Sequence, residues 1–405
     1  MLISSLALRN VFRHRIRSTV ALAAIAFSTI VLMLAGGFVE WIFWAMREAA
    51  TETGLGHIQV MRPGYLDNGA ADPFSFLLPE NSSVLSSLEK DQHVKAVAQR
   101  LNFSGLISYG DATLSFVGTG VDPEKEEIVS RNLPILEGEN LAKGDPEGII
   151  LGAGLANNLG MPVGARVVLL VNTRSGGVSA VEARVRGLFS TQVKAFDDVA
   201  LKVPLQMARQ LLRVKGAHVW VVALDDVERS ADAATHFKSQ FADSKLEFLQ
   251  WSDLADFYNK TVRLLSTQMG VVRLMIGLII VLGISNMLVM NVLERTGEVG
   301  TLMALGTRRR KVIELFLGEG LLLGLVGGGI GVIIALILAK VISAVGIPMP
   351  PPPGRSVGYS AGILLDWSLA AWAFGLAVGS AVLASLYPSW KASRLVIVDA
   401  LRQNR

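Results

Sequence analysis

The chain has 405 residues, of which 51% are hydrophobic and only 18% are charged, and its formal net charge is +4. Soluble domains are usually about a quarter charged, so this composition favours a membrane protein. The absence of cysteine excludes disulfides, thiolate metal sites and a cysteine nucleophile.

Four apolar runs are long enough to cross a bilayer core of about 30 Å, which needs about 20 helical residues. They lie at residues 18–39, 270–293, 312–339 and 367–387. The first run follows an arginine-rich start, as a signal peptide would. It is too long for a typical signal-peptide core, it lacks a clear small-residue cleavage site, and three further runs follow it. We therefore expect it to be retained as a membrane span.

The distribution of basic residues predicts the orientation in the membrane, because cytoplasmic loops carry an excess of Lys and Arg. The loop between the third and fourth runs offers only Lys340 and Arg355. The N-terminal segment, the loop between the second and third runs and the tail together carry many more: Arg9, Arg13, Arg15, Arg17, Arg295, Arg308, Arg309, Arg310, Lys311, Lys391, Arg394, Arg402 and Arg405. Both termini and the loop 294–311 are therefore predicted to be cytoplasmic, and residues 47–265 extracytoplasmic.

The long segment after the first span is large enough to be a folded domain with its own core. Strand-like runs lie at 57–61, 113–118, 166–171, 181–189 and 218–224, and helical pieces at about 80–90, 152–159, 204–213 and 228–242. This mixture predicts an α+β domain, built as two subdomains because strands come before and after helical insertions.

Two helical stalks are expected to join this domain to the membrane. Ser252 is a suitable N-cap and Asp253 places an acid in the first turn, and no proline separates them from the second span. A single helix over 252–293 is therefore predicted. The first span continues through Trp41 and Trp44 at the membrane interface into helix-compatible residues. Such a geometry can carry force.

These segments predict an α-helical membrane protein with four transmembrane helices and a large α+β extracytoplasmic domain between spans one and two. The proline-rich stretch 348–354 must be extended, either as a stiff surface loop or as a contact with the outer domain. The predicted order is: cytoplasmic amphipathic helix 1–17, span and stalk 18–46, outer domain 47–251, stalk and span 252–293, cytoplasmic helix 294–311, span 312–340, outer loop 341–366, span 367–388 and cytoplasmic tail 389–405.

Motifs for catalysis and nucleotide binding are absent from the sequence. It contains no G-x-x-x-x-G-K-[ST] loop, no G-x-S-x-G elbow and no H-E-x-x-H pair. Its five histidines are scattered without metal-ligand spacing. The stretch 152–157 approaches a dinucleotide fingerprint, but Asn157 stands where the third glycine should be, so a turn and a short helix are expected. We expect a non-catalytic membrane subunit that binds no metal, no cofactor and no nucleic acid.

The spans contain glycines at small-xxx-small spacing and two charged residues. Glycines so spaced let helix backbones approach closely, either within the chain or against a second copy. The predicted helix-packing residues are Gly320, Gly324, Gly328, Gly375 and Gly379. Glu319 and Arg273 are candidates for a transport path, because charge inside a membrane is commonly functional. Glu319 is also close enough to the cytoplasmic face to be solvated.

The polar stretch 294–311 interrupts two of the most apolar runs in the chain. Gly297 and Gly306 bracket about two helical turns, and basic residues at 308–311 can lie at anionic headgroups. The positions that can share an apolar face with Gly306 are Val299, Leu302 and Met303. A short amphipathic helix is therefore predicted at the cytoplasmic surface, either touching lipid or inserted into a groove of a partner.

This stretch resembles the pattern E-R-x-x-E-[IV]-G-x-x-x-A-[LM]-G of the FtsX/MacB-like, or type VII, class of ABC transporter permeases. The matching residues are Glu294, Arg295, Glu298, Val299, Gly300, Ala304, Leu305 and Gly306. Residues 6–18 and 387–402 are similar to the amphipathic first helix and the closing segment of that family, except that Ile397 replaces a usual proline. Residues 150–170 resemble part of its periplasmic domain.

The resemblance implies mechanotransmission in an inner-membrane complex. Two copies of a separate cytoplasmic ABC ATPase, which bind ATP and Mg²⁺, would grip the coupling helix of this permease and of a second copy or paralogue. The implied ATPase-coupling residues are Glu294, Arg295, Glu298, Val299, Gly300, Met303, Ala304 and Gly306. The motion would pass to the periplasmic domain, so that cargo need not cross the bilayer.

The layout is most similar to that of lipoprotein-releasing permeases. This similarity implies a lipoprotein or another hydrophobic substrate, with membrane lipid as a further contact. An alternative is an FtsX-like signalling scaffold that activates a periplasmic cell-wall enzyme. A third class, a membrane-anchored enzyme, has little support from the motifs.

Overall fold

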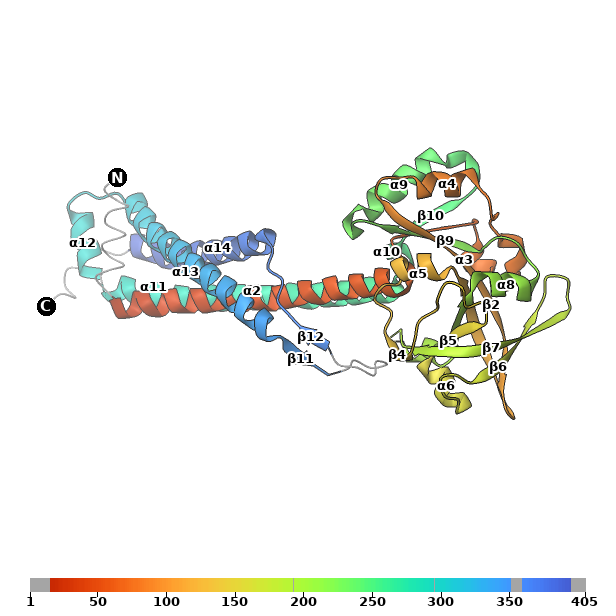
Figure 1. The fold of residues 1–405 in the computed structure, drawn as a ribbon. Coiled ribbons are helices and arrows are strands. Elements are labelled where there is room, and N and C mark those ends of the chain that lie inside the picture. The colour runs from red at the N-terminus through yellow and green to blue at the C-terminus, as the bar shows by residue number, and fades with distance from the viewer. Residues whose placement is uncertain (1–14, 192, 295, 351–358, 395–405) are drawn as a thin grey trace. The chain divides into compact units, whose positions relative to one another are not determined.

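The computed structural model describes residues 15–191, 193–294, 296–350 and 359–394. The chain forms two compact units, an α/β unit made mainly of residues 45–260 and a helical unit made of the segments before and after it. Figure 1 shows the long helices of the second unit and the sheet of the first. Most of the predicted amphipathic segment 1–17 and the position of Ile397 lie outside the described residues.

Among the described residues, four helices are long and apolar enough to cross a membrane, as the hydropathy of the sequence predicted. They are α2 (Arg15–Ala50), α11 (Asp256–Glu294), α13 (Arg309–Val345) and α14 (Trp367–Ser393). With 36 and 39 residues, α2 and α11 exceed the length of about 20 residues that a bilayer requires. The α/β domain lies between these two helices in the chain, which confirms the predicted fold class.

The four long helices are held together by small and branched apolar side chains. One cluster of buried residues joins all four, with Ile25 from α2, Ile284 and Leu288 from α11, Leu323 from α13 and Ala381 from α14. Alanines supply most of the contribution of α14. Because alanine and glycine bring backbones close together, this packing is typical of membrane helices, which associate through close contact rather than through exclusion of water.

The α/β unit is built on one mixed sheet. In sheet order its strands are β10 (Glu247–Gln250), β1 (Ile58–Met61), β9 (Val219–Leu224), β2 (Val94–Tyr109), β3 (Ala112–Val121), β8 (Ala200–Pro204), β5 (Gly148–Gly152), β7 (Val178–Phe189) and β4 (Ile135–Gly138), and β6 (Arg166–Asn172) pairs with β2 and β7. The β3–β8 and β5–β7 pairs are parallel and the other pairs are antiparallel.

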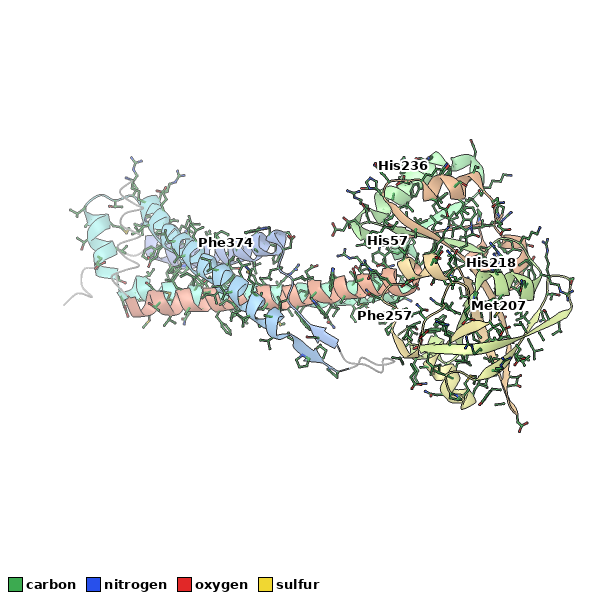
Figure 2. The ribbon with its side chains drawn as sticks, in the orientation of Figure 1. His57, Met207, His218, His236, Phe257 and Phe374 are labelled. Atoms are coloured by element: carbon green, nitrogen blue, oxygen red, sulfur yellow. The ribbon has the colours of Figure 1, made fainter. Side chains whose placement is uncertain are left out.

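Two hydrophobic cores divide this sheet, in agreement with the expected two subdomains. The fully buried Trp220 lies in the core covered by α4 (Ser83–Glu89) and α9 (Ser230–Gln240). The larger core, which contains Met207 (Figure 2), is covered by α6 (Ala153–Leu159) and α8 (Leu205–Leu212). Strand β2 extends through both, because it pairs with β9 up to Arg100 and with β3 from there onward.

Short helices complete the α/β unit. They are η1 (Thr51–Leu55, a π-helix), α3 (Tyr65–Asn68), η2 (Pro73–Phe76), α5 (Pro123–Val129), α7 (Lys194–Asp197), η3 (Val227–Arg229), η4 (Ala242–Ser244) and α10 (Trp251–Leu254). The η1 turn follows α2 directly and ends at Gly56, whose φ is +65°. A π-helical turn places one extra residue in the helix and often marks a functional position.

The predicted single helix over 252–293 is wrong at its start. Gln250 caps the separate helix α10 through a capping box with Asp253, and Ala255 leaves the helical region with φ −93° and ψ 60°. The long helix α11 begins only at Asp256. Asp253 therefore serves the earlier turn, and its acidic side chain, expected in the first turn of the span helix, stabilises α10 instead.

Two short strands, β11 (Ile347–Met349) and β12 (Tyr359–Ala361), pair near the end of α13. They flank the proline-rich stretch, of which residues 351–354 lie outside the described residues. The expected extended conformation is therefore described only at its first residues, where Met349 ends β11.

Candidate functional site: the α12 connector and the anchor of α2

The stretch that the sequence singled out folds as a short helix, α12 (Thr296–Ala304), between α11 and α13. Thr296 is buried, and its hydroxyl donates to the carbonyl oxygens of Val292 at 3.0 Å and Leu293 at 2.8 Å. Gly306 follows the helix with φ +92°, a conformation that favours glycine. The connector is thus fastened to α11 at one end and stopped by a glycine at the other.

One face of α12 is buried against the ends of three long helices. Val299 joins a cluster with Val292 of α11, Val312 and Phe316 of α13 and Ala392 of α14. Met303 packs partly against the same cluster, and Gly300 is buried. The valine, which the sequence placed on the apolar face, therefore contacts the chain's own helices, and a displacement of α12 must disturb three of them.

The opposite face of α12 is free of such contacts and is exposed. It carries Glu298 and Thr301, and Leu305 just beyond the helix is 80% exposed. Of the predicted coupling residues, Glu294, Glu298, Ala304 and Gly306 are exposed, Val299 and Gly300 are buried, Met303 is half-buried, and Arg295 lies outside the described residues. Thr301 and Leu305 were not in the predicted set, although an exposed leucine beside a short helix is a usual feature of a docking surface.

The glycines of α13 form two stripes that contact different helices. A Cβ atom added at Gly320 would lie 2.7 Å from Ser385 Cβ, and one at Gly328 would lie 3.2 Å from the ring of Phe374, both on α14 (Figure 2 labels Phe374). A Cβ atom at Gly324 would lie 3.0 Å from Ala381 Cβ, on the same helix. Gly327 and Gly331 instead face Ile25 and Thr29 of α2. Absent side chains are therefore what allow α13 to lie between α2 and α14.

The two glycines of α14 behave differently from those of α13. A Cβ atom added at Gly375 or Gly379 would meet no atom within 4 Å, and both residues are exposed. Within the described part of the chain, these two predicted packing residues therefore take no part in a helix–helix contact. Their spacing matches that of Gly320 and Gly324, so the spacing alone could not distinguish them.

The two charged residues of the spans lie in different surroundings. Glu319 of α13 is buried and adjoins Gly320 at the α13–α14 contact. Arg273 of α11 is half-buried, with its guanidinium carbon 4.7 Å from the centre of the Trp372 ring on α14. A guanidinium over an indole face is a favourable cation–π arrangement.

In the α/β unit, the far end of α2 is anchored by charged side chains. Arg131 forms ion pairs with Glu48, at 3.4 Å, and with Glu52. The side chain of Asn132 also donates to Glu52, and its backbone N–H donates to the Glu52 carbonyl oxygen at 3.3 Å. The guanidinium of Arg100 donates to the carbonyl oxygen of Gly54 within η1. The helix end is thus tied both to the loop after α5 and to strand β2.

Arg100 also belongs to a buried ionic cluster around Glu126 of α5. The Glu126 carboxylate accepts from Arg100 Nε at 3.0 Å, Arg100 Nη2 at 2.9 Å, Lys202 Nζ at 2.8 Å and Ser130 Oγ at 2.8 Å. Burial by itself would raise the pKa of Glu126, but the two cations outweigh it and lower the pKa to about 2. Burial lowers the pKa of Lys202, and Glu126 opposes that change. The cluster connects α5, β2 and β8 through one carboxylate.

A polar cavity of about 1040 Å³ opens between α4, α5 and α8. Its charged groups neutralise one another in pairs, because Arg209 bonds Glu80 at 2.8 Å, Lys143 bonds Glu124 at 2.8 Å, and Lys125 bonds Glu89. Among the described residues no group of three or more His, Asp or Glu side chains could hold a metal ion. Nothing in this cavity therefore resembles a catalytic constellation.

Comparison with known proteins gives two family matches that together cover most of the chain. The description "MacB-like periplasmic core domain" matches residues 18–239, and "FtsX-like permease C-terminal" matches residues 270–397. The first match spans the α2 helix and most of the α/β unit, and the second spans α12 and the helices around it.

Individual relatives are more distant. A macrolide export ATP-binding/permease protein of Wolinella succinogenes is 25% identical over 98% of this chain and 60% of its own length. A lipoprotein-releasing system transmembrane protein of Xylella fastidiosa is 25% identical over 70% of this chain and 72% of its own. A macrolide export protein of Syntrophobacter fumaroxidans is 32% identical, but over 35% of this chain and only 19% of its own length. The chain thus spans much less than the whole of several relatives.

Among solved structures, the periplasmic region of MacB from Actinobacillus actinomycetemcomitans is similar to 52% of this chain, over 95% of its own length. The sequence identity is 14% and the TM-score is 0.38.

Proposed function

Since the chain belongs to the family of FtsX-like permeases with a MacB-like periplasmic core domain, we propose that it is the membrane subunit of an ABC transporter complex. A separate ATPase binds and hydrolyses ATP with Mg²⁺ and docks on α12. The observation that carries this proposal is the division of α12 into two faces. Val299 is buried against three membrane helices, while Glu298, Thr301 and Leu305 are left exposed for a partner.

The helix α11 provides a path from this docking surface to the α/β domain. Its 39 residues run from Glu294, beside α12, to Asp256, beside the last strand of the sheet. At 1.5 Å per residue this helix is about 58 Å long. A push on α12 reaches it through the Thr296 hydrogen bonds and the Val299 contacts. The anchored end of α2 gives the domain a second attachment.

Orientation and assembly follow from the same proposal. The α12 surface is cytoplasmic, with the basic residues Arg308, Arg309 and Arg310 beside it, and the α/β domain is periplasmic. Two ATPase subunits serve this chain and a second copy or a paralogue in the inner membrane. Exposed Gly375 and Gly379 on α14 leave a surface on which a neighbouring helix could pack.

The cargo is the finer part of the proposal. The relatives are described as a macrolide exporter and a lipoprotein-releasing protein, and both descriptions involve transport of a hydrophobic substance. We therefore favour extraction or export of a lipoprotein or another hydrophobic substrate over activation of a cell-wall enzyme. Cargo bound to the purified complex, identified by mass spectrometry, would decide between these outputs.

Orientation can be tested directly, because the natural chain has no cysteine. Thr301→Cys on α12 and Val178→Cys on the exposed start of β7 would each be treated with a membrane-impermeant maleimide in right-side-out and inverted vesicles. The two cysteines are expected to react from opposite sides. Labelling of both from the same side would contradict the proposal.

ATPase docking can be tested with matched charge changes. Glu298→Lys places a cation on the exposed face of α12, whereas Glu228→Lys makes the same change on an exposed residue of the α/β domain. The first variant is expected to lose its co-purifying ATPase and the second to keep it. Equal retention by both variants would mean that the ATPase does not bind at α12.

A further inference from the structure

Helices α11 and α14 lie side by side and run parallel. Ser285 Oγ of α11 donates to the Ala384 carbonyl oxygen of α14 at 2.7 Å, and these residues are 99 positions apart. Arg273 and Trp372, whose side chains form the cation–π pair, are separated by the same number of positions. The two contacts therefore share one register. At 1.5 Å per residue, the Arg273–Trp372 pair lies about 18 Å from the Ser285 bond, toward the end of α11 that continues into the α/β domain.

The aromatic residues of α14 indicate the depth of this pair in a membrane. Trp367, at the start of the helix, is 81% exposed, and Tyr387 is 58% exposed. Their separation along the helix is about 30 Å, which equals the thickness of a hydrocarbon core, and Trp and Tyr concentrate at the two membrane interfaces. Trp372 lies about 8 Å inward from Trp367. Arg273 therefore lies just below the headgroups of the leaflet nearer the α/β domain.

The charge of Arg273 is left without an anion by the described part of the chain. No carboxylate oxygen among the described residues lies within 4 Å of its guanidinium, and its Nε atom is buried without a hydrogen-bond partner. Its neighbours on α11, Val271, Leu274 and Met275, are exposed apolar side chains. A guanidinium carries five N–H donors, and a charge at this depth is costly unless it finds acceptors. The indole face of Trp372 supplies attraction but no acceptor.

We propose that Arg273 and Trp372 form a binding site for the phosphate group of a phospholipid in this leaflet. The guanidinium donates to two phosphate oxygens, the paired geometry that arginine forms with phosphate. Trp372, which is 47% exposed, holds the guanidinium at the lipid-facing side of the α11–α14 contact. The apolar side chains around Arg273 lie where the glycerol and first acyl carbons of such a lipid would be. The proposal requires that the helices span a membrane, and it does not depend on the ATPase.

The test uses the full chain, delipidated in detergent and titrated with phosphatidylglycerol under native mass spectrometry. Diacylglycerol with the same acyl chains lacks the phosphate, and inorganic phosphate lacks the chains. We expect retention of phosphatidylglycerol, no retention of diacylglycerol and no competition by inorganic phosphate at equal concentration. Retention of diacylglycerol to the same extent would overturn the site, and equal binding of inorganic phosphate would overturn its assignment to lipid.

Variants locate the site. Arg273→Gln is expected to weaken phosphatidylglycerol binding at least about tenfold, the loss that corresponds to one charge-assisted contact. Arg273→Lys keeps the charge but not the paired geometry, and is expected to bind with intermediate affinity. The matched control is Lys340→Gln, which removes an exposed cation near the corresponding end of α13. Equal binding by the wild type and Arg273→Gln would overturn the proposal.

Two further measurements guard the interpretation. If Arg273→Gln fails to fold, Trp372→Phe replaces it, because phenylalanine keeps an aromatic face with a weaker cation–π attraction, and unchanged lipid affinity in that variant would then count against the site. The mass of the wild-type assembly is measured alongside. Loss of a second copy in Arg273→Gln with no change in bound lipid would assign the cation to a carboxylate of that copy instead, and would overturn the lipid site.

Discussion

Arg100 bonds both carboxylate oxygens of Glu126, at 3.0 Å and 2.9 Å, and the same guanidinium donates to the carbonyl oxygen of Gly54 at the end of the α2 helix. The side chain that neutralises a buried acid therefore also holds the helix. The sheet feels the position of the helix end through this one residue. Because the cluster is almost closed to water, its bonds are geometrically strict, which suits a joint that must transmit displacement.

Removal of the acid from this cluster is expected to destabilise the α/β unit strongly. Glu126→Gln leaves the buried cations Arg100 and Lys202 without their anion, and breaking a buried ionic group in this way costs about 3–5 kcal/mol. The measurement is hydrogen exchange of the β2 and β8 amides in the full chain. The control Glu182→Gln removes an exposed partner of Arg166 and should cost less than about 1 kcal/mol. Equal effects of the two variants would contradict the importance of the cluster.

Acid should weaken the same cluster in a defined pH range. The pKa of Glu126 is about 2 in the folded chain, below the ordinary value of 4.5. Its contribution is therefore fully present above pH 4.5 and is lost as the pH falls toward 2, because the unfolded chain takes up the proton first. The stability of Glu126→Gln should vary less over this interval. A parallel decline of wild type and variant would show that other groups cause the acid sensitivity.

A second pH dependence is expected from His218, labelled in Figure 2. Its Nδ1 accepts from the backbone N–H of Asn102 at 3.0 Å, and its Nε2 donates to the Pro73 carbonyl oxygen at 3.0 Å. Burial lowers its pKa from 6.5 to about 4. Stability that depends on the neutral ring is therefore complete above pH 6.5 and is lost as the pH falls through 4.

Substitution separates this effect from general acid denaturation. His218→Gln cannot titrate, so the change in stability between pH 6.5 and 4 should become smaller, although the variant is less stable at neutral pH by about 1–3 kcal/mol. The control His236→Gln replaces an exposed histidine (Figure 2). The measurement is hydrogen exchange at β2 and β9 against pH. An unchanged slope in His218→Gln would contradict the assignment.

The glycine stripes of α13 and α14 predict opposite outcomes for the same substitution. A methyl group at Gly320 would lie 2.7 Å from Ser385, whereas one at Gly379 would meet nothing within 4 Å. Gly320→Ala should therefore separate α13 from α14 and cost about 1–3 kcal/mol, as overpacking does. Gly379→Ala should be neutral or slightly stabilising, because alanine favours a helix. Thermal unfolding in detergent measures both, and similar losses would indicate that Gly379 is covered in the assembly.

Sequence patterns predicted those elements whose faces have one environment throughout. Strand β7 was expected at 181–189 and is Val178–Phe189, because its apolar and polar residues alternate over a half-buried strand. Strand β2 was not predicted, although it has 16 residues and is the longest strand. Its register with β9 shifts between Val94 and Ala96, and the strand passes from one core to the other. No single alternation therefore describes it.

The candidate site shows the same division between pattern and partner. Helical spacing correctly placed Val299 on an apolar face, but it could not say that the chain's own α11, α13 and α14 cover that face. The small-xxx-small spacing is the same for Gly320 and Gly375, and only the position of the neighbouring helices makes one of them tight and the other open. The anchor between Arg131 and Glu52 joins residues far apart in the chain and had no sequence signal.

This anchor yields the prediction that most directly concerns force transmission. Arg131→Glu replaces its ion pairs with Glu48 and Glu52 by repulsion at the end of α2. The Arg131 side chain is 56% exposed, so the stability of the α/β unit should fall by less than about 1 kcal/mol. ATP hydrolysis by the docked partner should continue, because α12 is untouched, while the work done by the periplasmic domain should fall.

The readouts are ATPase activity and cargo release in reconstituted vesicles, measured together. Leu305→Asp, on the exposed side of the connector, should lower both activities, since it removes the docking of the ATPase itself. In the double variant Arg131→Glu with Glu52→Arg, a pair of opposite charges is restored in reverse, and cargo release should recover in part. If Arg131→Glu released cargo like the wild type, the end of α2 would be a passive attachment, and α11 alone would carry the displacement.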